Sequence, residues 1–449
     1  MIHKFSINGI NIVVDVYSGA VHMVDDIVYE LLDYYMKMNK DAIIALFKNK
    51  YSEYQLEEAY NEIEELHENG LLYTDDPYQD YVDLWDKQSV VKALCLHVSH
   101  DCNLRCKYCF ASTGSFQGDR LLMSGEVGKK AIDFVIKNSG KRRNIEIDFF
   151  GGEPLMNFDV VKEIVEYAKK EGAKAGKTFR FTITTNGLLL NEDIKNYINS
   201  NMSNVVLSLD GTKEVNDDMR IRINGRGCYD DIVPKFLDIA QSRGQDNYYV
   251  RGTFTRKNLN FAKDVLHLAD LGFKQTSVEP VVAPDSEEYA LKKEDLPILY
   301  SEYEKLAVEY LKRKKEQKGF NFFHFMIDLS QGPCVVKRLS GCGSGHEYLA
   351  VTPEGDIYPC HQFVGHQNFK MGNVFTDEFN TDIKQLFQKS NVYTKEKCKE
   401  CWAKFYCSGG CPANAYQFNK DINEPYLLGC ELEKKRIECA LMIQAALAI

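Results

Sequence analysis

Three cysteines lie close together in the segment CNLRCKYC. Cys102, Cys106 and Cys109 have the spacing CxxxCxxC, and thiolates so spaced select zinc or an iron–sulfur cluster. Three thiolates leave one corner of a four-iron cluster without a protein ligand, and an open iron is a place for chemistry. A structural zinc loop is the alternative, but closed zinc sites use four protein ligands. Because no fourth Cys or His follows within a dozen residues, the spacing favours an iron–sulfur cluster.

The residues at the end of this segment favour one class of iron–sulfur protein. Tyr108, Cys109 and Phe110 form the run YCF, and the stretch as a whole resembles the signature of radical S-adenosylmethionine (SAM) enzymes. The resemblance implies that the three cysteines hold a catalytic [4Fe-4S] cluster. It also implies that SAM binds the free iron through its amino and carboxylate groups, with Tyr108 and Phe110 beside it.

The middle of the chain has a regular alternation. Residues 91–318 alternate short β-rich runs with helical patterns, which predicts parallel strands joined by crossover helices. We expect strands at Ala93–Ser99, Ile145–Phe149, Phe179–Thr184, Val205–Leu209, Tyr248–Thr255 and Gln275–Pro280. Six such units are too few for a closed eight-fold barrel. The predicted fold class is therefore α/β, with a partial (β/α)6 TIM-like barrel.

Polar motifs follow the first four of these strands. After the cysteine triad come GGEP, TTNG and SLDG, and turns that follow parallel strands lie on one face of a sheet. One such motif alone is an ordinary turn; three in order, on successive strands, predict one site. Similar motifs in radical SAM enzymes bind SAM, and Arg220 would pair with its carboxylate. The implied SAM contacts are Gly151, Gly152, Glu153, Pro154, Thr185, Asn186, Ser208, Asp210 and Arg220.

A second group of cysteines occupies the C-terminal part. The stretch CKECWAKFYCSGGC resembles the SPASM domain of peptide-modifying radical SAM enzymes, which houses two further four-iron clusters. The resemblance assigns a distal cluster to Cys398, Cys401, Cys407 and Cys430. It assigns a cluster nearer SAM to Cys342, Cys360 and Cys411, whose fourth ligand would be Cys334 or a substrate thiolate. A pair of zinc knuckles is the alternative.

The front of the chain is acidic and separately patterned. Residues 1–90 hold 18 Asp and Glu against 6 Lys and Arg, a balance of −12 within a total of −10. Short strands over Phe5–Val24, then helices at Asp25–Met38, Lys40–Lys48 and Tyr54–Asn69, predict a small winged-helix-like module. Modules of this type in peptide maturases bind the leader of a precursor, and the leader would add as a strand. The charge argues against the rival DNA-binding role.

Length and composition set the remaining expectations. The 449 residues allow about three domains, and we expect boundaries at 1–80 for the recognition module, 81–91 for a linker, 92–318 for the barrel and 319–449 for the SPASM domain. The N-terminus alternates apolar and polar residues, which predicts a strand and not a secretory signal peptide. In a large chain of this kind the 14 cysteines favour metal binding over a disulfide framework. No apolar run is long enough for a bilayer. The protein is expected in the cytoplasm, without nucleic-acid or membrane partners.

Nearly the whole chain resembles the maturases of SCIFF peptides (six cysteines in forty-five residues), which install thioether crosslinks. The resemblance implies a Cys-rich precursor peptide, three [4Fe-4S] clusters, SAM cleavage to a 5′-deoxyadenosyl radical, and an electron donor such as ferredoxin or flavodoxin. Other SPASM enzymes, forming carbon–carbon bonds or formylglycine, remain open, as do an iron–sulfur electron carrier and a zinc-dependent regulator. His361 stands where sulfatase maturases have an acidic residue, which disfavours formylglycine formation.

Overall fold

The computed structural model describes residues 1–82, 89–329, 339–376 and 378–448. Its front unit is a three-stranded antiparallel sheet followed by three helices. The strands are β1 (Ile2–Ile7), β2 (Ile10–Asp15) and β3 (Val21–Val24), and the helices are α1 (Asp26–Leu31), α2 (Lys40–Phe47) and α3 (Glu53–Glu68). Side chains of Asp25, Asn39 and Ser52 cap the three helices. The expected first helix was too long, because after Leu31 the chain continues as turns.

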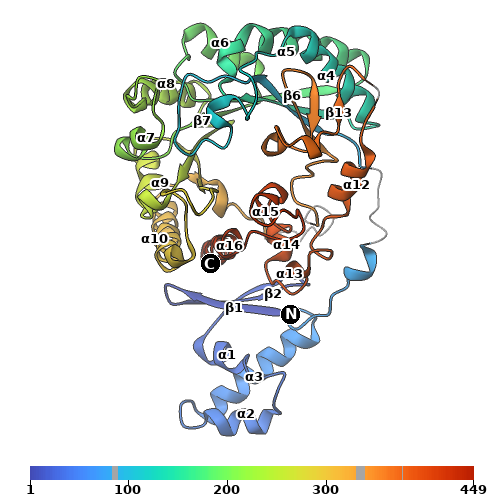
Figure 1. The fold of residues 1–449 in the computed structure, drawn as a ribbon. Coiled ribbons are helices and arrows are strands. Elements are labelled where there is room, and N and C mark those ends of the chain that lie inside the picture. Colours follow the sequence, from blue (N-terminus) through green and yellow to red (C-terminus); the bar gives the residue numbers. More distant parts are fainter. Residues whose placement is uncertain (83–88, 330–338, 377, 449) are drawn as a thin grey trace.

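The centre of the molecule is an open, curved parallel sheet with helices on its outer side (Figure 1). Its order is β10-β9-β8-β7-β6-β5-β4-β11-β12-β13. The six predicted barrel strands are all present, as β4 (Ala93–Ser99), β5 (Asn144–Gly151), β6 (Thr178–Thr185), β7 (Asn204–Ser208), β8 (Tyr248–Phe254) and β9 (Gln275–Pro280). All pair in parallel. The partial TIM-like barrel is therefore confirmed.

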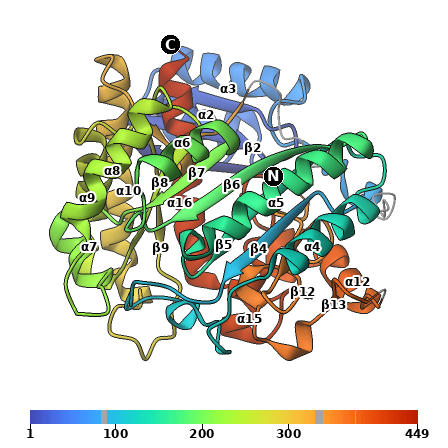
Figure 2. The same ribbon diagram turned by 90° about the horizontal axis from the view of Figure 1, so that it is seen from above.

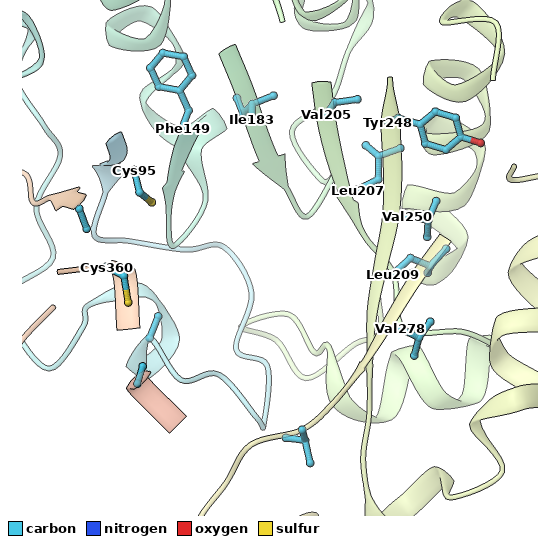
Figure 3. Packing of buried hydrophobic residues seen from close by; sticks show 14 of the residues in the cluster. Cys95, Phe149, Ile183, Val205, Leu207, Leu209, Tyr248, Val250, Val278 and Cys360 are labelled. Carbon is cyan, nitrogen blue, oxygen red and sulfur yellow. The ribbon is translucent and has the colours of Figure 1, made fainter. Parts of the chain in front are cut away.

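Crossover helices cover the outer face of this sheet (Figure 2). They are α4 (Gly125–Asn138), α5 (Phe158–Lys174), α6 (Glu192–Asn201), α7 (Lys213–Met219), α8 (Tyr229–Ser242), α9 (Phe261–Asp270) and α10 (Leu296–Lys315). Every residue of β4 is buried, as expected for a strand with neighbours on both sides. Cys95 in this strand is 1% exposed, and it lies in the same core as Phe149, Ile183 and Leu207 (Figure 3).

The C-terminal part continues the same sheet. β11 (Tyr348–Val351) pairs in parallel with β4, and β12 (Asp356–Tyr358) and β13 (Gly372–Asn373) extend the edge in antiparallel fashion. β10 (Asn321–Phe322) closes the other edge beside β9. Four short helices follow: α12 (Thr381–Lys389), α13 (Glu396–Lys399), α14 (Lys404–Cys407) and α15 (Pro412–Asn419). Cys398 lies in α13, Cys407 in α14 and Cys411 directly before α15. The loops that hold these cysteines are thus anchored directly on the barrel.

The last helix, α16 (Leu427–Leu447), joins the three parts of the molecule. It packs on α10 and contacts all three strands of the front sheet, so that the sheet faces α16 while α1 to α3 point away (Figure 1). Cys439 and Ile443 on this helix are fully buried, which makes it a docked core helix. In the described part of the chain, no helix is both long and apolar enough to cross a membrane.

A buried charge ties the front unit to the C-terminal loops. The ammonium of Lys404, on α14, lies 3.3 Å from a carboxylate oxygen of Asp76 and 3.4 Å from the hydroxyl of Tyr17. The Lys404 side chain is only 1% exposed. Tyr393 donates to the same carboxylate at 2.9 Å, and the ring of His3 stacks on Trp402 with centroids 3.8 Å apart. Residues between Cys401 and Cys407 therefore form part of the surface on which the front unit packs.

Candidate functional site

The cysteine triad lies in a loop that a second segment holds in place. The backbone amides of Arg105 and Lys107 donate to the carbonyls of Ile221 and Met219, at 2.7 and 2.9 Å, and Leu104 forms a bridge with Arg222. The three cysteines line a hollow of about 150 Å³ together with the GGEP turn, Asn186, Ser208 and Arg220. The structure therefore brings together four motifs that the sequence places far apart.

The buried thiols in this hollow need a bound cation in order to ionise. Burial raises the pKa of Cys102 to about 11 and that of Cys106 to about 12, so neither thiol ionises readily alone. The amide of Leu104 donates to the Cys102 sulfur at 3.4 Å, and the side-chain amide of Asn186 does so at 3.7 Å. Such donors favour a thiolate over a thiol, and metal binding provides the remaining drive for deprotonation. The donor set therefore fits an iron–sulfur cluster.

The two glycines of GGEP have a packing role. Gly151 has φ +126°, and a Cβ there would overlap the carbonyl of Ser99. A Cβ on Gly152 would overlap the carbonyl of Asp101, the residue before Cys102. The Gly152 amide donates to Ser99, and the Glu153 amide to Asp101, at 2.7 and 2.9 Å. The glycines thus let the cysteine loop lie directly on the end of β5.

Replacing Gly152 with alanine should therefore displace the cysteine loop. Its Cβ overlaps backbone, which cannot move aside as a flexible side chain could, so we expect a loss of about 1–3 kcal/mol in unfolding free energy and incomplete iron loading of the triad. Iron content per chain and chemical denaturation measure both effects. Gly118→Ala is the matched control, because its Cβ meets only Ser115 at an ordinary 3.6 Å. Equal iron content in the two variants would contradict this account.

The Glu153 side chain links the ends of β5 and β6 through hydrogen bonds. Its side chain is fully buried and accepts hydrogen bonds from the Asn186 amide at 2.8 Å, the Thr185 hydroxyl at 2.8 Å and the Leu155 amide at 3.0 Å. Burial raises its pKa, while these three donors act in the opposite direction. The sequence predicted a SAM contact here. That contact stays a prediction, and these bonds show that the carboxylate also has a structural role, with Pro154 starting the short helical turn that follows.

A buried chain of polar groups runs along the other wall of the hollow. A guanidinium nitrogen of Arg220 donates to the Tyr108 hydroxyl at 2.9 Å, and this hydroxyl donates to the Asp210 carboxylate at 2.6 Å. The Nε of Arg220 is buried and has no hydrogen-bond partner among the described residues. An unpartnered guanidinium N–H in a hollow fits an incoming carboxylate. SAM carries such a carboxylate, so the residues present fit it.

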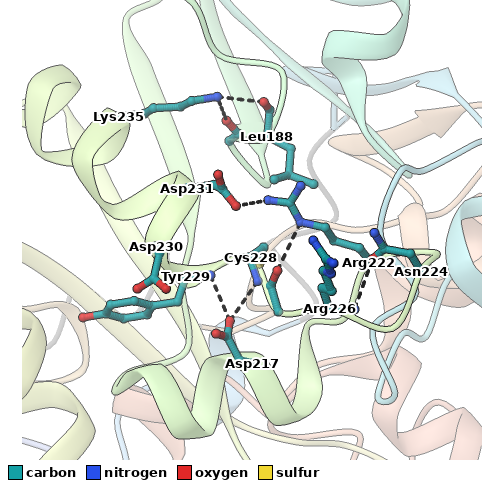
Figure 4. A network of polar contacts seen from close by, with 12 residues as sticks. Leu188, Asp217, Arg222, Asn224, Arg226, Cys228, Tyr229, Asp230, Asp231 and Lys235 are labelled. Atoms are coloured by element: carbon teal, nitrogen blue, oxygen red, sulfur yellow. Dashed lines mark hydrogen bonds and ion pairs between the residues drawn. The ribbon is translucent and has the colours of Figure 1, made fainter.

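A network of polar contacts orders the loop that follows α7 and Arg220 in the chain (Figure 4). Asp217 accepts hydrogen bonds from the amides of Cys228 and Tyr229, both at 2.8 Å. Arg222 forms an ion pair with Asp231 and donates to the carbonyl of Gly227 at 3.1 Å. This network closes the turn at residues 222–227 and fixes the backbone that pairs with the cysteine loop.

A larger cavity of about 590 Å³ joins this hollow to the C-terminal cysteines. Ser208, Thr184, Phe110 and Phe150 line both spaces. On its far side the cavity is bounded by Cys407, Cys411 and Cys430, with His361 and Gln362 between the two ends. Phe110, Phe150 and His361 pack against one another, with centroids 5.1 to 6.5 Å apart. One cavity therefore reaches from the hollow of the cysteine triad to the C-terminal cysteines.

Sequence reasoning missed the charged wall of this cavity. Glu279 accepts from Arg436 at 3.2 Å and lies 3.9 Å from Arg251. Arg436 also donates to Nδ1 of His324 at 3.0 Å, whose Nε2 lies 3.2 Å from the Ser277 hydroxyl. Since an arginine can only donate, Nδ1 of His324 is an acceptor and the ring is neutral. Glu279 ends a barrel strand, so the strand-end rule applied to β9 would have found it.

His324 predicts a pH dependence of stability. Burial lowers its pKa to about 3 in the folded protein, against about 6.5 in an unfolded chain. Below pH 6.5 the unfolded chain takes up a proton that the folded chain does not. His324 alone should therefore contribute a fall of about 2 kcal/mol in unfolding free energy between pH 6.5 and 5. Urea titrations at both pH values measure this. The fall in the His324→Gln variant should be smaller than the fall in wild type by about that amount, and an equal fall in both proteins would contradict it.

The auxiliary cysteines fall into two groups in space. The thiols of Cys398, Cys401 and Cys407 lie near Cys430. Burial, and to a smaller extent the neighbouring thiols, raise the pKa of Cys407 and of Cys430 to about 11. Cys360 is buried, and the nearby thiols of Cys411 and Cys342 raise its pKa further. These are the two predicted ligand sets, apart from Cys334, which lies outside the described residues.

A buried lysine lies between the two groups. Lys395 is 3% exposed and donates to the Gly409 carbonyl at 2.8 Å. Burial lowers its pKa, whereas the thiols of Cys398, Cys407, Cys411 and Cys430 act in the opposite direction. Within the described ranges, no three His, Cys, Asp or Glu side chains converge tightly enough for a single metal ion. Ligands of a cubane differ in this respect, because they bind separate irons.

Comparison with known families gives matches in two parts of the chain. The profile of the radical SAM superfamily matches residues 96–269, and that of the SPASM iron–sulfur cluster-binding domain matches residues 342–402. The first match contains the cysteine triad and all of the strand-end motifs. The chain therefore contains a radical SAM TIM-like core followed by a C-terminal SPASM domain.

Individual relatives agree with this class. A cysteine-type anaerobic sulfatase-maturating enzyme of Clostridium novyi is 27% identical over 337 residues, which cover 70% of this chain and 86% of the relative. The structure of anSMEcpe with bound AdoMet and Kp18Cys peptide superposes with a TM-score of 0.65 at 21% identity, covering 80% of this chain and 99% of that one. SuiB of Streptococcus suis, bound to precursor peptide SuiA, gives 0.51 at 17% identity and covers 94% and 96%. The last two show a shared fold.

Proposed function

We propose that this protein is a cytoplasmic maturase that links cysteine sulfurs to carbon in a ribosomally made, Cys-rich precursor peptide. The observation that carries the proposal is the single cavity of about 590 Å³ between the SAM side and the auxiliary cysteines. A peptide segment in this cavity can present a C–H bond to one end and a thiol to the other. The proposed thioether-forming function rests on this spatial relation and on the resemblance to SCIFF maturases.

The cofactors of this proposal are SAM and three [4Fe-4S] clusters. The clusters, when bound, would supply the electron that cleaves SAM to methionine and a 5′-deoxyadenosyl radical, and would accept the surplus electron after the carbon–sulfur bond forms. Cys102, Cys106 and Cys109 would hold the first cluster. Cys398, Cys401, Cys407 and Cys430 would hold the second, and Cys342, Cys360 and Cys411 the third. The described residues would thus supply three ligands for the third cluster, and a substrate thiolate or Cys334 would be its fourth.

The side chains around the cavity have defined tasks in this proposal. Arg220 would hold the SAM carboxylate with its free Nε, while Tyr108 and Asp210 keep the guanidinium in place. Ser208 lies at the end of β7, where both spaces meet, and would contact SAM. Phe110 and Phe150 line the passage and would exclude water from the reacting carbon.

The front unit would bind the leader of the precursor. Within the described chain β3 pairs only with β2, which leaves one of its edges open to an added strand. Residues 1–90 carry −12, which suits a basic leader. Because the unit rests on the loops around Lys404 and Trp402, a leader bound here would bring the core of the peptide close to the cavity.

The experiment is incubation of reconstituted protein with SAM, dithionite and the precursor, followed by tandem mass spectrometry. The proposal predicts a loss of two hydrogens for each crosslink, with fragmentation placing each link at a cysteine. A precursor with its cysteines replaced by alanine is the control and should stay unmodified. A crosslink between two carbons, or no change of mass while 5′-deoxyadenosine is released, would contradict thioether formation.

Sulfatase maturation is the second candidate, favoured by the match to the enzyme of Clostridium novyi. Against it, His361 follows Cys360 where sulfatase maturases have an acidic residue, and His361 lines the cavity. Burial lowers the pKa of His361 to about 4, so this side chain is neutral and cannot replace a carboxylate. A sulfatase peptide should therefore yield no formylglycine aldehyde, and its formation would favour this second function.

A further inference from the structure

The surface outside the cysteine loop combines cationic and apolar side chains. We propose that it is the docking site for an acidic, low-potential one-electron carrier protein. The surface, here called the docking patch, consists of Leu188, Leu189, Arg222, Ile223 and Lys235, which line a shallow hollow with Asn103, and of Arg226, which lies in the same loop as Arg222 (Figure 4). The inference rests on the proposed SAM site and is independent of the peptide product.

The docking patch is continuous with the cluster ligands. Asn103, which lines the hollow, follows Cys102 directly in the chain. Its side chain accepts a hydrogen bond from Asn186 at 2.7 Å, and the same Asn186 amide lies 3.7 Å from the Cys102 sulfur. On the other side of the cysteine loop, the backbone of Arg222 forms an isolated β-bridge with that of Leu104. A carrier seated here is therefore separated from the cluster by little more than the cysteine loop itself.

The composition of the docking patch suits a protein partner. Ile223 is 68% exposed and Leu189 is 39% exposed, whereas large apolar side chains on a free surface are usually scattered singly. Arg226 is exposed and forms no ion pair with any described residue. Arg222 and Lys235 add two further cations against one carboxylate, Asp231. Such a surface would attract an acidic carrier. The front unit, in which residues 1–90 have a formal net charge of −12, would repel it.

The position also leaves the catalytic cavity free. None of the docking-patch residues lines the cavity of about 590 Å³, so a carrier and a peptide could be bound together. The step at this surface is the transfer of one electron: the reduced carrier is oxidised by one electron and the cluster on the cysteine triad is reduced by one. No bond forms or breaks in this step.

The test compares two reductants with one set of variants of the reconstituted protein. The probe is a bacterial flavodoxin, whose binding is followed by flavin fluorescence and whose hydroquinone drives SAM cleavage; dithionite needs no docking site. The Arg226→Glu, Ile223→Ser double variant should raise the flavodoxin Kd about tenfold and lower the flavodoxin-driven rate in proportion. Its dithionite-driven rate should stay within about twofold of wild type, since neither side chain contacts the proposed SAM site.

The control is Arg143→Glu, the same charge reversal just before β5, at the opposite end of the sheet. It should leave the Kd unchanged. An unchanged Kd in the double variant, an equal weakening by Arg143→Glu, or no binding of flavodoxin to wild type would overturn the proposal. So would an equal loss of the dithionite-driven rate. If wild type binds flavodoxin but does not cleave SAM with dithionite, the proposed SAM site fails while the Kd comparison still decides docking.

Discussion

Replacing Cys106 with alanine is expected to abolish SAM cleavage and to remove about four irons per chain from a total of about twelve. The thiol lies in the hollow with Cys102 and Cys109, and no other described cysteine lines that hollow. Two remaining thiolates cannot hold a four-iron cluster against loss of iron. Anaerobic iron and sulfide analysis, together with chromatography of 5′-deoxyadenosine, measures both effects.

The control for this variant is Cys95→Ala. Cys95 is equally a cysteine, but it lies in the core of β4, so its loss should cost about 1 kcal/mol of unfolding free energy and no iron. Full iron content in Cys106→Ala, or continued release of 5′-deoxyadenosine, would show that the triad does not hold the catalytic cluster.

Replacing Asp76 with alanine is expected to lower the unfolding free energy by about 3–5 kcal/mol. The Lys404 ammonium is then left buried without its carboxylate, although it keeps the Lys399 carbonyl at 3.0 Å, the Tyr17 hydroxyl and the nearby aromatic rings. Tyr393 loses its acceptor at the same time. Since these contacts join the front unit to α14, urea denaturation of the full chain should show an earlier transition.

Two further variants separate this effect from a general loss of charge. Lys404→Met in the Asp76→Ala background removes the stranded ammonium and should recover at least about 2 kcal/mol. Asp33→Ala removes the exposed carboxylate that pairs with Lys4, and should cost less than about 1 kcal/mol. If Asp76→Ala costs no more than Asp33→Ala, the buried pair does not hold the front unit in place.

The sequence allowed the barrel to be predicted nearly strand by strand. Its strands are apolar runs with turn residues at both ends, so the local pattern and the tertiary position agree. Ala93–Ser99 and Gln275–Pro280 match the structure at both ends. The strand-end motifs could also be placed, because parallel strands bring their carboxyl ends to one face. The spacing of Cys102, Cys106 and Cys109 placed these three thiols together, whereas the grouping of the C-terminal cysteines came from the resemblance to SPASM domains.

Roles that depend on long-range contacts were beyond the sequence pattern. The glycines of GGEP were predicted to admit SAM, yet their lost side chains make room for the carbonyls of Ser99 and Asp101. Glu153 bonds to residues 32 and 33 positions away, and Arg436 reaches Glu279 across 157 positions. No periodicity encodes such pairs. The extension of the barrel sheet by β11, beside β4, is of the same kind.

The central claim is that an open iron on the Cys102, Cys106 and Cys109 cluster binds and cleaves SAM. Release of 5′-deoxyadenosine by anaerobically purified, dithionite-reduced protein tests it most directly. The account predicts 5′-deoxyadenosine and methionine in equal amounts from wild type, and neither from Cys106→Ala. Intact SAM after incubation with wild-type protein that carries its full complement of iron would contradict it.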